Sequence, residues 1–274
     1  LVADCCEVEA PACFLFSLGP DQTGRAITRV FRPGFFRKVS RTSVVQIYGV
    51  RTLLNGTLLP APHIGRRNAA VMRAVRDAGF ETGIHTWDHV KWQDGVRHAD
   101  GAWTREQMQR ACDRYEQIFG ERARVHGAAG WQMNRHSYRL TQQLGFDYCS
   151  DTRGNAPFIP IVNAEIIACP QLPTTLPTLD ELIGVNEITV DNVADHLLRL
   201  SADHPSTGHV YTLHAELEGM KLAPVFEKLL AGWRAAGYEL VSLHDYCAAF
   251  EAGALPRHVV EDAEIPGRSG TLSL

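Results

Sequence analysis

The sequence lacks any run of eighteen apolar residues, so it predicts no helix that crosses a membrane. Its first residues also lack the charged and then apolar layout of a secretory signal peptide. The 7 cysteines are odd in number and form no Cys-x-x-Cys spacing, which favours buried, reduced thiols over a disulfide framework. No repeat, low-complexity tract or linker divides the chain, and we therefore expect one domain in the cytoplasm.

Acidic residues are missing from one long segment. Residues 22–76 contain no aspartate or glutamate, although they hold 11 of the chain's 27 lysines and arginines. Aromatic rings alternate with these charges, most densely at Arg29, Arg32, Phe35, Phe36, Arg37 and Lys38. Rings at headgroup depth and cations beside lipid phosphates, worth about 1 kcal/mol per cation, predict reversible attachment to an anionic membrane surface. An arginine-rich solvated insertion over about residues 22–66 is the alternative. Nucleic-acid binding is disfavoured, because the rest of the chain is acidic and carries no binding motif.

Strand-like runs alternate with helical patterns along the chain. The strand-like runs are 12–18, 81–85, 125–129, 148–151, 165–168, 209–214 and 239–243. The helical patterns are 66–78, 104–119, 134–144, 190–201 and 223–236. This alternation predicts an α/β fold with a parallel sheet closed as a barrel, whose catalytic residues lie at the carboxyl ends of strands. His85, Asp151 and His214 each end a strand-like run.

Two histidines four residues apart, His85 and His89, indicate a metal site. On a helical turn this spacing places both imidazoles on one face, about 6 Å apart along the axis and within reach of one cation. A chance pair among the 12 histidines is the alternative. Thr86 excludes the zincin peptidase motif, which needs glutamate at that position. Zinc, manganese, cobalt and iron suit such ligands about equally well.

His214 ends the apolar run 210–213 and is expected to point into the site, where it could protonate a leaving amine. Asp151 is predicted to orient His214 and to favour its protonated form. The alternatives are a hydrogen-bonded core histidine and an aspartate that caps a helix or pairs with Arg153. Glu216 and Glu218 follow His214 and either hold substrate or remain solvated loop charges.

These elements together resemble the polysaccharide deacetylase (NodB-homology) family over nearly the whole chain. Within that family, the sequence is most similar to the 4-deoxy-4-formamido-L-arabinose-phosphoundecaprenol deformylases. The segments that carry the resemblance are 16–21 (FSLGPD), 83–93 (GIHTWDHVKWQ), 128–131 (AAGW), 150–154 (SDTRG), 172–178 (LPTTLPT) and 211–219 (YTLHAELEG).

The resemblance implies a distorted (β/α) barrel of about seven units, forming a single catalytic domain over 1–274. It implies that His85 and His89 bind one divalent metal ion, that His214 is the general acid and that Asp151 tunes it. The substrate contacts it implies come from Trp87, Asp88, Trp131, Arg153, Glu216 and Glu218. The implied reaction is hydrolysis of the formamide of undecaprenyl-phosphate-linked 4-deoxy-4-formamido-L-arabinose by metal-activated water. Its products are formate and the amino-sugar lipid used for lipid A modification and polymyxin resistance. The enzyme would lie at the inner face of the bacterial inner membrane.

The sequence departs from the family pattern at two points. The family's first motif, an Asp-x-Asp-like strand that supplies a base and a third metal ligand, has no counterpart here. Asp4 falls in the expected first helix and substitutes for that motif poorly, so we expect a chain truncated before its first strand. Gln132 stands where general deacetylases often carry arginine. The alternative functions are an N-acetyl sugar deacetylase acting on another glycan and a non-catalytic carbohydrate- or lipid-binding relative.

Overall fold

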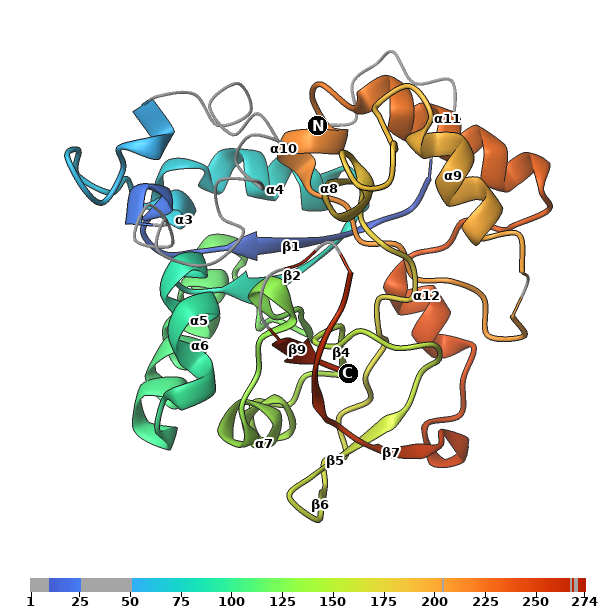
Figure 1. Cartoon of the computed structure of the whole chain (residues 1–274). Helices are drawn as coiled ribbons and strands as arrows, with labels where there is room; N and C mark the ends of the chain where they lie inside the picture. The colour runs from blue at the N-terminus through green and yellow to red at the C-terminus, as the bar shows by residue number, and fades with distance from the viewer. Residues whose placement is uncertain (1–9, 26–50, 204, 267, 269–270) are drawn as a thin grey trace.

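The computed structural model describes residues 10–25, 51–203, 205–266, 268 and 271–274 (Figure 1). The strands are β1 (Cys13–Ser17), β2 (Glu81–Thr86), β3 (Val125–His126), β4 (Tyr148–Cys149), β5 (Ile159–Val162), β6 (Glu165–Ile166), β7 (Arg257–Val259), β8 (Asp262–Glu264) and β9 (Thr271–Ser273). The α-helices are α3 (Ile64–Arg67), α4 (Ala69–Asp77), α5 (His89–Gly95), α6 (Gly101–Phe119), α7 (Arg135–Gln143), α8 (Leu179–Leu182), α9 (Val193–Leu200), α10 (Ala215–Glu218), α11 (Ala223–Ala235) and α12 (Leu243–Ala248). Short 3₁₀ helices are η2 (Val96–His98), η3 (Ala129–Trp131) and η4 (Ala252–Ala254).

Four parallel strands form the centre in the order β1-β2-β3-β4, as the sequence pattern predicts (Figure 1). Gly83 makes the close packing of β2 possible, because a Cβ there would lie 2.4 Å from the side chain of Val125. Beyond β4, extended chain continues the sheet through backbone hydrogen bonds. Leu172 N donates to Cys149 O at 2.7 Å, and Thr175 N donates to Val210 O at 3.0 Å. The predicted run 209–214 is therefore extended chain beside residues 174–176, although it is not assigned as a strand.

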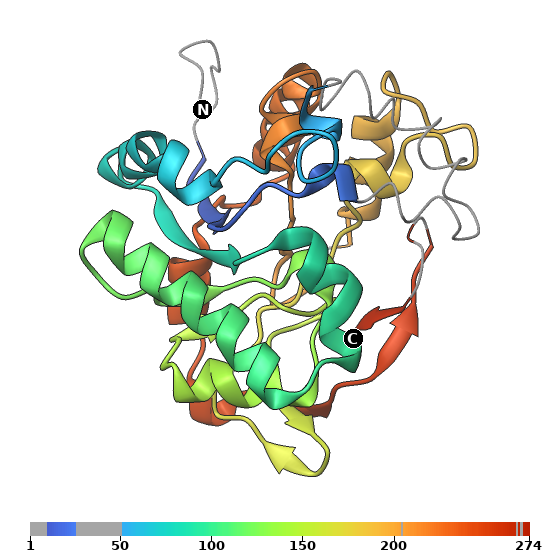
Figure 2. The same cartoon turned by 90° about the vertical axis from the view of Figure 1, so that its left-hand side faces the viewer.

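Helices cover the sheet on its outer side. Figure 2 shows α6 and α7, in green, side by side on this side of the molecule. Helix α6 begins at the N-cap Asp100, whose side chain accepts a hydrogen bond from Trp103 N, and ends at Gly120 in the left-handed conformation. The start predicted at Thr104 is thus one turn too late, because Asp100 is the residue that caps the helix. Helix α7 has Asn134 as its N-cap, which agrees with the helical pattern predicted at 134–144, and the structure adds a capping box there.

Three clusters of buried apolar residues hold these layers together, and the smallest consists of Val125, Tyr148 and Leu172. The largest core lies between the sheet and helices α5 to α7 and buries Ile84, Trp92 and Met108. The second lies under α9 and α11 and buries Leu197, Leu229 and Trp233 among others. Together they fix the edge of the sheet at which the carboxyl ends of β2, β3 and β4 meet.

The strand prediction at 239–243 is wrong, and the one at 165–168 is confirmed only in part. Residues 165–168 contribute only the short β6, which pairs with β5 in a separate three-stranded sheet away from the parallel strands. Residues 239–243 form no strand in the described structure, although Leu240 packs against the second core. Both runs are rich in apolar residues, and periodicity alone does not distinguish a short strand from irregular chain.

None of the helices in the described ranges has the length and apolar character needed to cross a membrane. The residues predicted to meet a lipid surface (Arg29, Arg32, Phe35, Phe36, Arg37 and Lys38) lie outside the described residues, as does Asp4.

Candidate active site

The two predicted metal ligands lie at the end of β2 and the start of α5. Strand β2 carries His85 as its second-last residue, and His89 is the first residue of α5. Their ring centroids are 5.1 Å apart. The pair therefore spans a strand-to-helix turn. The spacing alone had indicated that both imidazoles share one face of a helix, and this is not the case. The turn is fixed by Asp88, which caps α5 by accepting a hydrogen bond from Lys91 N at 3.0 Å.

One ring nitrogen of His85, Nδ1, is hydrogen-bonded to the backbone. Its Nδ1 lies 2.7 Å from the carbonyl oxygen of Gly127, an oxygen that can only accept, so Nδ1 carries the proton. The lone pair of the neutral ring is then on Nε2. Burial lowers the pKa of His85 to about 4, so the ring is neutral at physiological pH. A neutral imidazole whose tautomer is set by a backbone carbonyl is the form that ligates a divalent cation.

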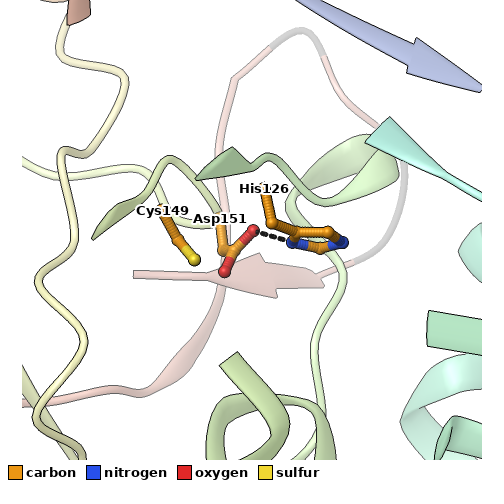
Figure 3. Close-up of side chains that lie close together, drawn as sticks. All are labelled: His126, Cys149 and Asp151. Atoms are coloured by element: carbon orange, nitrogen blue, oxygen red, sulfur yellow. Dashed lines mark hydrogen bonds and ion pairs between the residues drawn. The ribbon is translucent and has the colours of Figure 1, made fainter. Parts of the chain in front are cut away.

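Asp151 holds the loop that carries this carbonyl (Figure 3). Its Oδ1 lies 2.7 Å from Nδ1 of His126 and accepts a hydrogen bond from Ala128 N at 2.9 Å. These two partners stand on either side of Gly127. Its lack of a side chain is required, because a Cβ at Gly127 would lie 2.3 Å from the Leu15 side chain. Asp151 therefore acts on the candidate metal site through Gly127 and His85.

The cluster in Figure 3 is itself a conceivable metal site. His126, Cys149 and Asp151 offer ligand atoms that all lie within 4.8 Å of one another. In a tetrahedral site, however, nitrogen and oxygen ligands bonded at about 2.0–2.2 Å lie about 3.3 Å apart, whereas Nδ1 of His126 and Oδ1 of Asp151 are 2.7 Å apart. Burial also raises the pKa of the Cys149 thiol, which opposes the thiolate form that binds metal. The cluster fits a hydrogen-bonded support better than a metal centre.

His214 lies at the N-cap of α10, at the end of the extended run 209–214. Besides burial, the charges of His214 and Asp151 act on the pKa of His85. The expected pairing of Asp151 with His214 is wrong, because the carboxylate of Asp151 is bound by His126, Ala128 and the Gln171 side chain. The acidic group facing His214 is Asp180 of α8, whose Oδ1 lies 3.7 Å from Nδ1 of the imidazole.

A buried ionic network stands behind Asp180. Glu181 accepts two hydrogen bonds from Nη1 of Arg153, at 2.8 and 3.0 Å, and a third from Nε of Arg268. The guanidinium carbons of Arg153 and Arg268 lie 4.8 and 4.3 Å from the ring centroid of Trp131. The Trp131 Nε1 donates to Thr174 Oγ1 at 3.1 Å, whereas Nη2 of Arg268 is buried without a hydrogen-bond partner among the described residues.

The site can be compared with known proteins once this geometry is established. A polysaccharide deacetylase family model matches residues 55–149. A probable 4-deoxy-4-formamido-L-arabinose-phosphoundecaprenol deformylase ArnD of Shewanella sediminis (strain HAW-EB3) is 35% identical over 262 residues, covering 96% of this chain and 84% of the relative. The chain belongs to the polysaccharide deacetylase family.

Two further polysaccharide deacetylase relatives agree with this assignment. A probable ArnD deformylase of Wigglesworthia glossinidia brevipalpis is 30% identical, covering 96% of this chain and 91% of the relative. A solved structure from Mycobacterium smegmatis, provisionally named a polysaccharide deacetylase, has a TM-score of 0.58 and 18% identity, covering 94% of this chain and 96% of that one. At that identity, the solved structure supports the fold alone.

Most of the residues predicted to bind substrate have buried side chains that contact other residues of the protein. Trp87, Asp88, Trp131, Arg153 and Glu218 are all buried. Trp87 packs against His63 and beneath the guanidinium of Arg110. Glu218 accepts hydrogen bonds from His214 N at 2.9 Å and from the Tyr211 hydroxyl at 3.0 Å. These side chains build the walls of the site, and substrate contact through them and through the half-buried Glu216 stays a prediction.

Gln132 shows what replaces the arginine found in general deacetylases. Its side-chain oxygen accepts a hydrogen bond from Nε of Arg97 at 2.9 Å, and its amide donates to Thr271 O. Arg97 in turn pairs with Asp262 at 2.6 Å. In this member of the family, position 132 therefore ties the site to the C-terminal strand β9 instead of forming a salt bridge within the site.

Sequence reasoning missed His126, Asp180 and Arg268. A signal existed for Asp180: Thr178-x-x-Glu181 has the spacing of a capping box, which predicts a helix start that places Asp180 in the first turn. The structure bears this out, since Glu181 accepts a hydrogen bond from Thr178 N at 3.0 Å. No local pattern marks His126 or Arg268, because their partners are distant in sequence.

Proposed function

We propose that this chain is a metal-dependent deformylase that hydrolyses the formamide of undecaprenyl-phosphate-linked 4-deoxy-4-formamido-L-arabinose. The main support is its similarity along 96% of its length to relatives that bear this activity in their names. The site geometry agrees with that chemistry, because two histidines suited to metal binding have ring centroids 5.1 Å apart and a third histidine, His214, faces a carboxylate. The products are formate and a free amino-sugar lipid, the substrate form used in lipid A modification.

His85 and His89 would hold the metal ion. The test of fit is the hydrogen bond between Nδ1 of His85 and Gly127 O, which leaves Nε2 as the ligating atom. A divalent ion bound there supplies Lewis acidity that activates water and stabilises negative charge on the formyl oxygen. Zinc, manganese, cobalt and iron remain equally suitable from the two imidazoles.

His214 would supply the proton that the reaction needs. When water adds to the formyl carbon and the carbon–nitrogen bond breaks, the departing sugar nitrogen must gain a proton to leave as a neutral amine. An imidazolium at position 214 can donate that proton and recover it from solvent. Glu218 fixes the backbone at this point by accepting from His214 N, so the acid is carried on an ordered segment.

The finer architecture belongs to the same proposal. We infer that the parallel strands and the extended segments beyond β4 form part of a distorted (β/α) barrel of about seven units in one catalytic domain. The basic aromatic segment at about 22–66 would bring the enzyme to the inner face of the bacterial inner membrane, where a polyprenyl phosphate substrate resides. Cations at an anionic surface and aromatic rings at headgroup depth support this placement.

Formate release is the direct test. The purified chain is incubated with the formamido-sugar lipid in detergent micelles, and formate is measured by coupled oxidation with formate dehydrogenase. Chelation should abolish release, and added Zn²⁺, Mn²⁺ or Co²⁺ should restore it. His85→Ala should abolish metal-dependent release, and His214→Ala should lower it about 10²–10⁴-fold. His258→Ala, at an exposed position of β7, is the matched control and should leave release unchanged.

Two results would contradict the proposal. Normal turnover by the His85→Ala, His214→Ala double variant would exclude this site. Release of acetate from the matching N-acetyl lipid at a higher rate than formate would show that the enzyme is a deacetylase for another glycan.

A further inference from the structure

The carboxylate that orients a general-acid histidine decides how that histidine works. The structure places the two candidate aspartates, Asp151 and Asp180, on different partners. Asp151 is fully buried and accepts hydrogen bonds from residues of β3, the following loop and Gln171. Asp180 faces His214, with 3.7 Å between Oδ1 and Nδ1.

The imidazole nitrogen that faces Asp180 lacks any other partner in the described structure. His214 Nδ1 is inaccessible to solvent and makes no hydrogen bond with the described residues. A buried ring nitrogen without a partner is costly, and the cost is removed if it donates a proton to a carboxylate. The 3.7 Å separation is slightly longer than a hydrogen bond, and catalytic contacts of this kind tighten when substrate is bound.

Asp180 is held in place independently of His214. The Thr178 hydroxyl donates to Asp180 Oδ1 at 2.6 Å, and Nη2 of Arg268 lies 3.9 Å from the same oxygen. The adjacent Leu179 is fully buried, and Glu181 is bound to Arg153, so the backbone on both sides of Asp180 is anchored. A carboxylate on so rigid a support can orient a neighbouring ring, which a mobile surface carboxylate cannot do.

Glu218, His85 and Arg268 are the other charged or titratable residues to consider near His214 or Asp180. Glu218 has both carboxylate oxygens engaged, by His214 N and by the Tyr211 hydroxyl. His85 has its own Nδ1 bound to Gly127 O. Arg268 reaches the histidine only through Asp180.

We propose that Asp180 is the positioning residue for His214, holding the proton on Nδ1 so that Nε2 serves the leaving amine, while Asp151 supports the metal ligand His85 through Gly127. This assignment rests on the proposed function for the role of His214. It assigns the orientation of His214 to Asp180 and leaves the support of His85 to Asp151. It predicts that substitution of Asp180 affects proton donation and that substitution of Asp151 affects metal affinity.

The test compares Asp180→Asn with Asp151→Asn in the full chain. Asparagine keeps the size of aspartate but removes its charge. For Asp180→Asn we expect kcat to fall about 10–100-fold, KM to stay unchanged, and the alkaline limb of the kcat–pH profile to move at least about one pH unit lower. For Asp151→Asn we expect Zn²⁺ affinity, measured by titration calorimetry, to fall about 10–100-fold, with the alkaline limb unmoved at saturating metal.

Controls address folding and nonspecific charge effects. Asp195→Asn removes an exposed carboxylate on α9 and should change neither readout. Asp180→Glu restores the charge and should return the alkaline limb towards its original position, which a merely structural role for Asp180 would not predict. Circular dichroism of each variant establishes that it is folded.

A readout without substrate separates this inference from the proposed function. In ¹⁵N-histidine NMR spectra of the Zn²⁺-loaded chain, the ring signals of His214 are those lost in His214→Gln. Their response to pH should change in Asp180→Asn and not in Asp151→Asn. The inference is overturned if Asp151→Asn moves the alkaline limb or these signals, or if Asp180→Asn moves neither. Absence of formate release from every variant and from the parent chain would refute the proposed function and leave the NMR result decisive for the pairing.

Discussion

The buried ion pair between Glu181 and Arg153 supports the strongest stability prediction. Both residues are nearly inaccessible to solvent, at 3% and 7% exposed, and Glu181 also accepts from Thr178 N and Arg268. The change to test is Glu181→Ala. It removes the carboxylate and leaves the Arg153 charge in the interior without an ionic partner.

The expected cost follows from that unpaired charge. Breaking a buried pair by deleting one member lowers the free energy of unfolding by about 3–5 kcal/mol. In a chain of this size, that corresponds to a decrease in Tm of about 10 °C. The matched control is Asp195→Ala, which removes a half-exposed carboxylate 2.7 Å from Lys228 and should cost about 0–1 kcal/mol.

Urea denaturation followed by tryptophan fluorescence and by circular dichroism measures both values. The double variant Arg153→Met, Glu181→Leu should recover much of the loss, because it removes the buried charge together with its partner. If Glu181→Ala costs no more than Asp195→Ala, the network behind Asp180 is solvated and does not act as a rigid support.

Two further predictions concern packing and pH. Gly19→Ala should lower the free energy of unfolding by about 1–3 kcal/mol, since its Cβ would lie 2.3 Å from the backbone oxygen of Trp87, whereas Gly253→Ala meets open space and should be neutral. Equal denaturation midpoints for these two variants would show that the chain at Gly19 can move away from Trp87 at no cost in stability. Burial raises the pKa of Glu218 above its unfolded value of about 4.3, so the folded chain loses stability as pH rises through the folded value. Glu218→Gln should therefore gain stability relative to the parent chain between pH 4 and 8, and a difference that is constant over this range would contradict the assignment.

The parts of the fold that could be predicted are those that depend on local pattern. The parallel strands β1 to β4 follow from apolar runs, and helices α6 and α7 follow from their periodicity and from the residues at their ends. The sequence singles out His85, Asp151 and His214 because each stands at the end of a strand-like run, and His89 because it lies four residues after His85. Metal binding by His85 and His89 and acid catalysis by His214 stay predictions. The sequence pattern predicts chemistry at the carboxyl edge of the sheet, and the structure places His85 near the carboxyl end of β2.

The partner of each group could not be predicted in the same way. Asp151 and Asp180 both lie near the carboxyl edge of the sheet, and the choice between them depends on side-chain direction and on competing donors. His126 was the competitor for Asp151, and it carried no signal beyond being one of 12 histidines. Within a strand, the position of a residue determines which face of the sheet its side chain is on. In the irregular chain that follows a short strand, side-chain contacts depend on how segments distant in sequence pack against it.

The hydrogen bonds from Gln132 to Thr271 and from Arg153 to Ser273 have a consequence for how the protein is made. The first of them closes a loop of 139 residues, and contacts of such long sequence separation form late and slowly. During synthesis, residues around 132 and 153 leave the ribosome well before β9 does. Their side chains therefore stay exposed to solvent or to chaperones until β9 has been synthesised and packs against them. Folding of the catalytic face is therefore expected to be completed only after β9 has been synthesised.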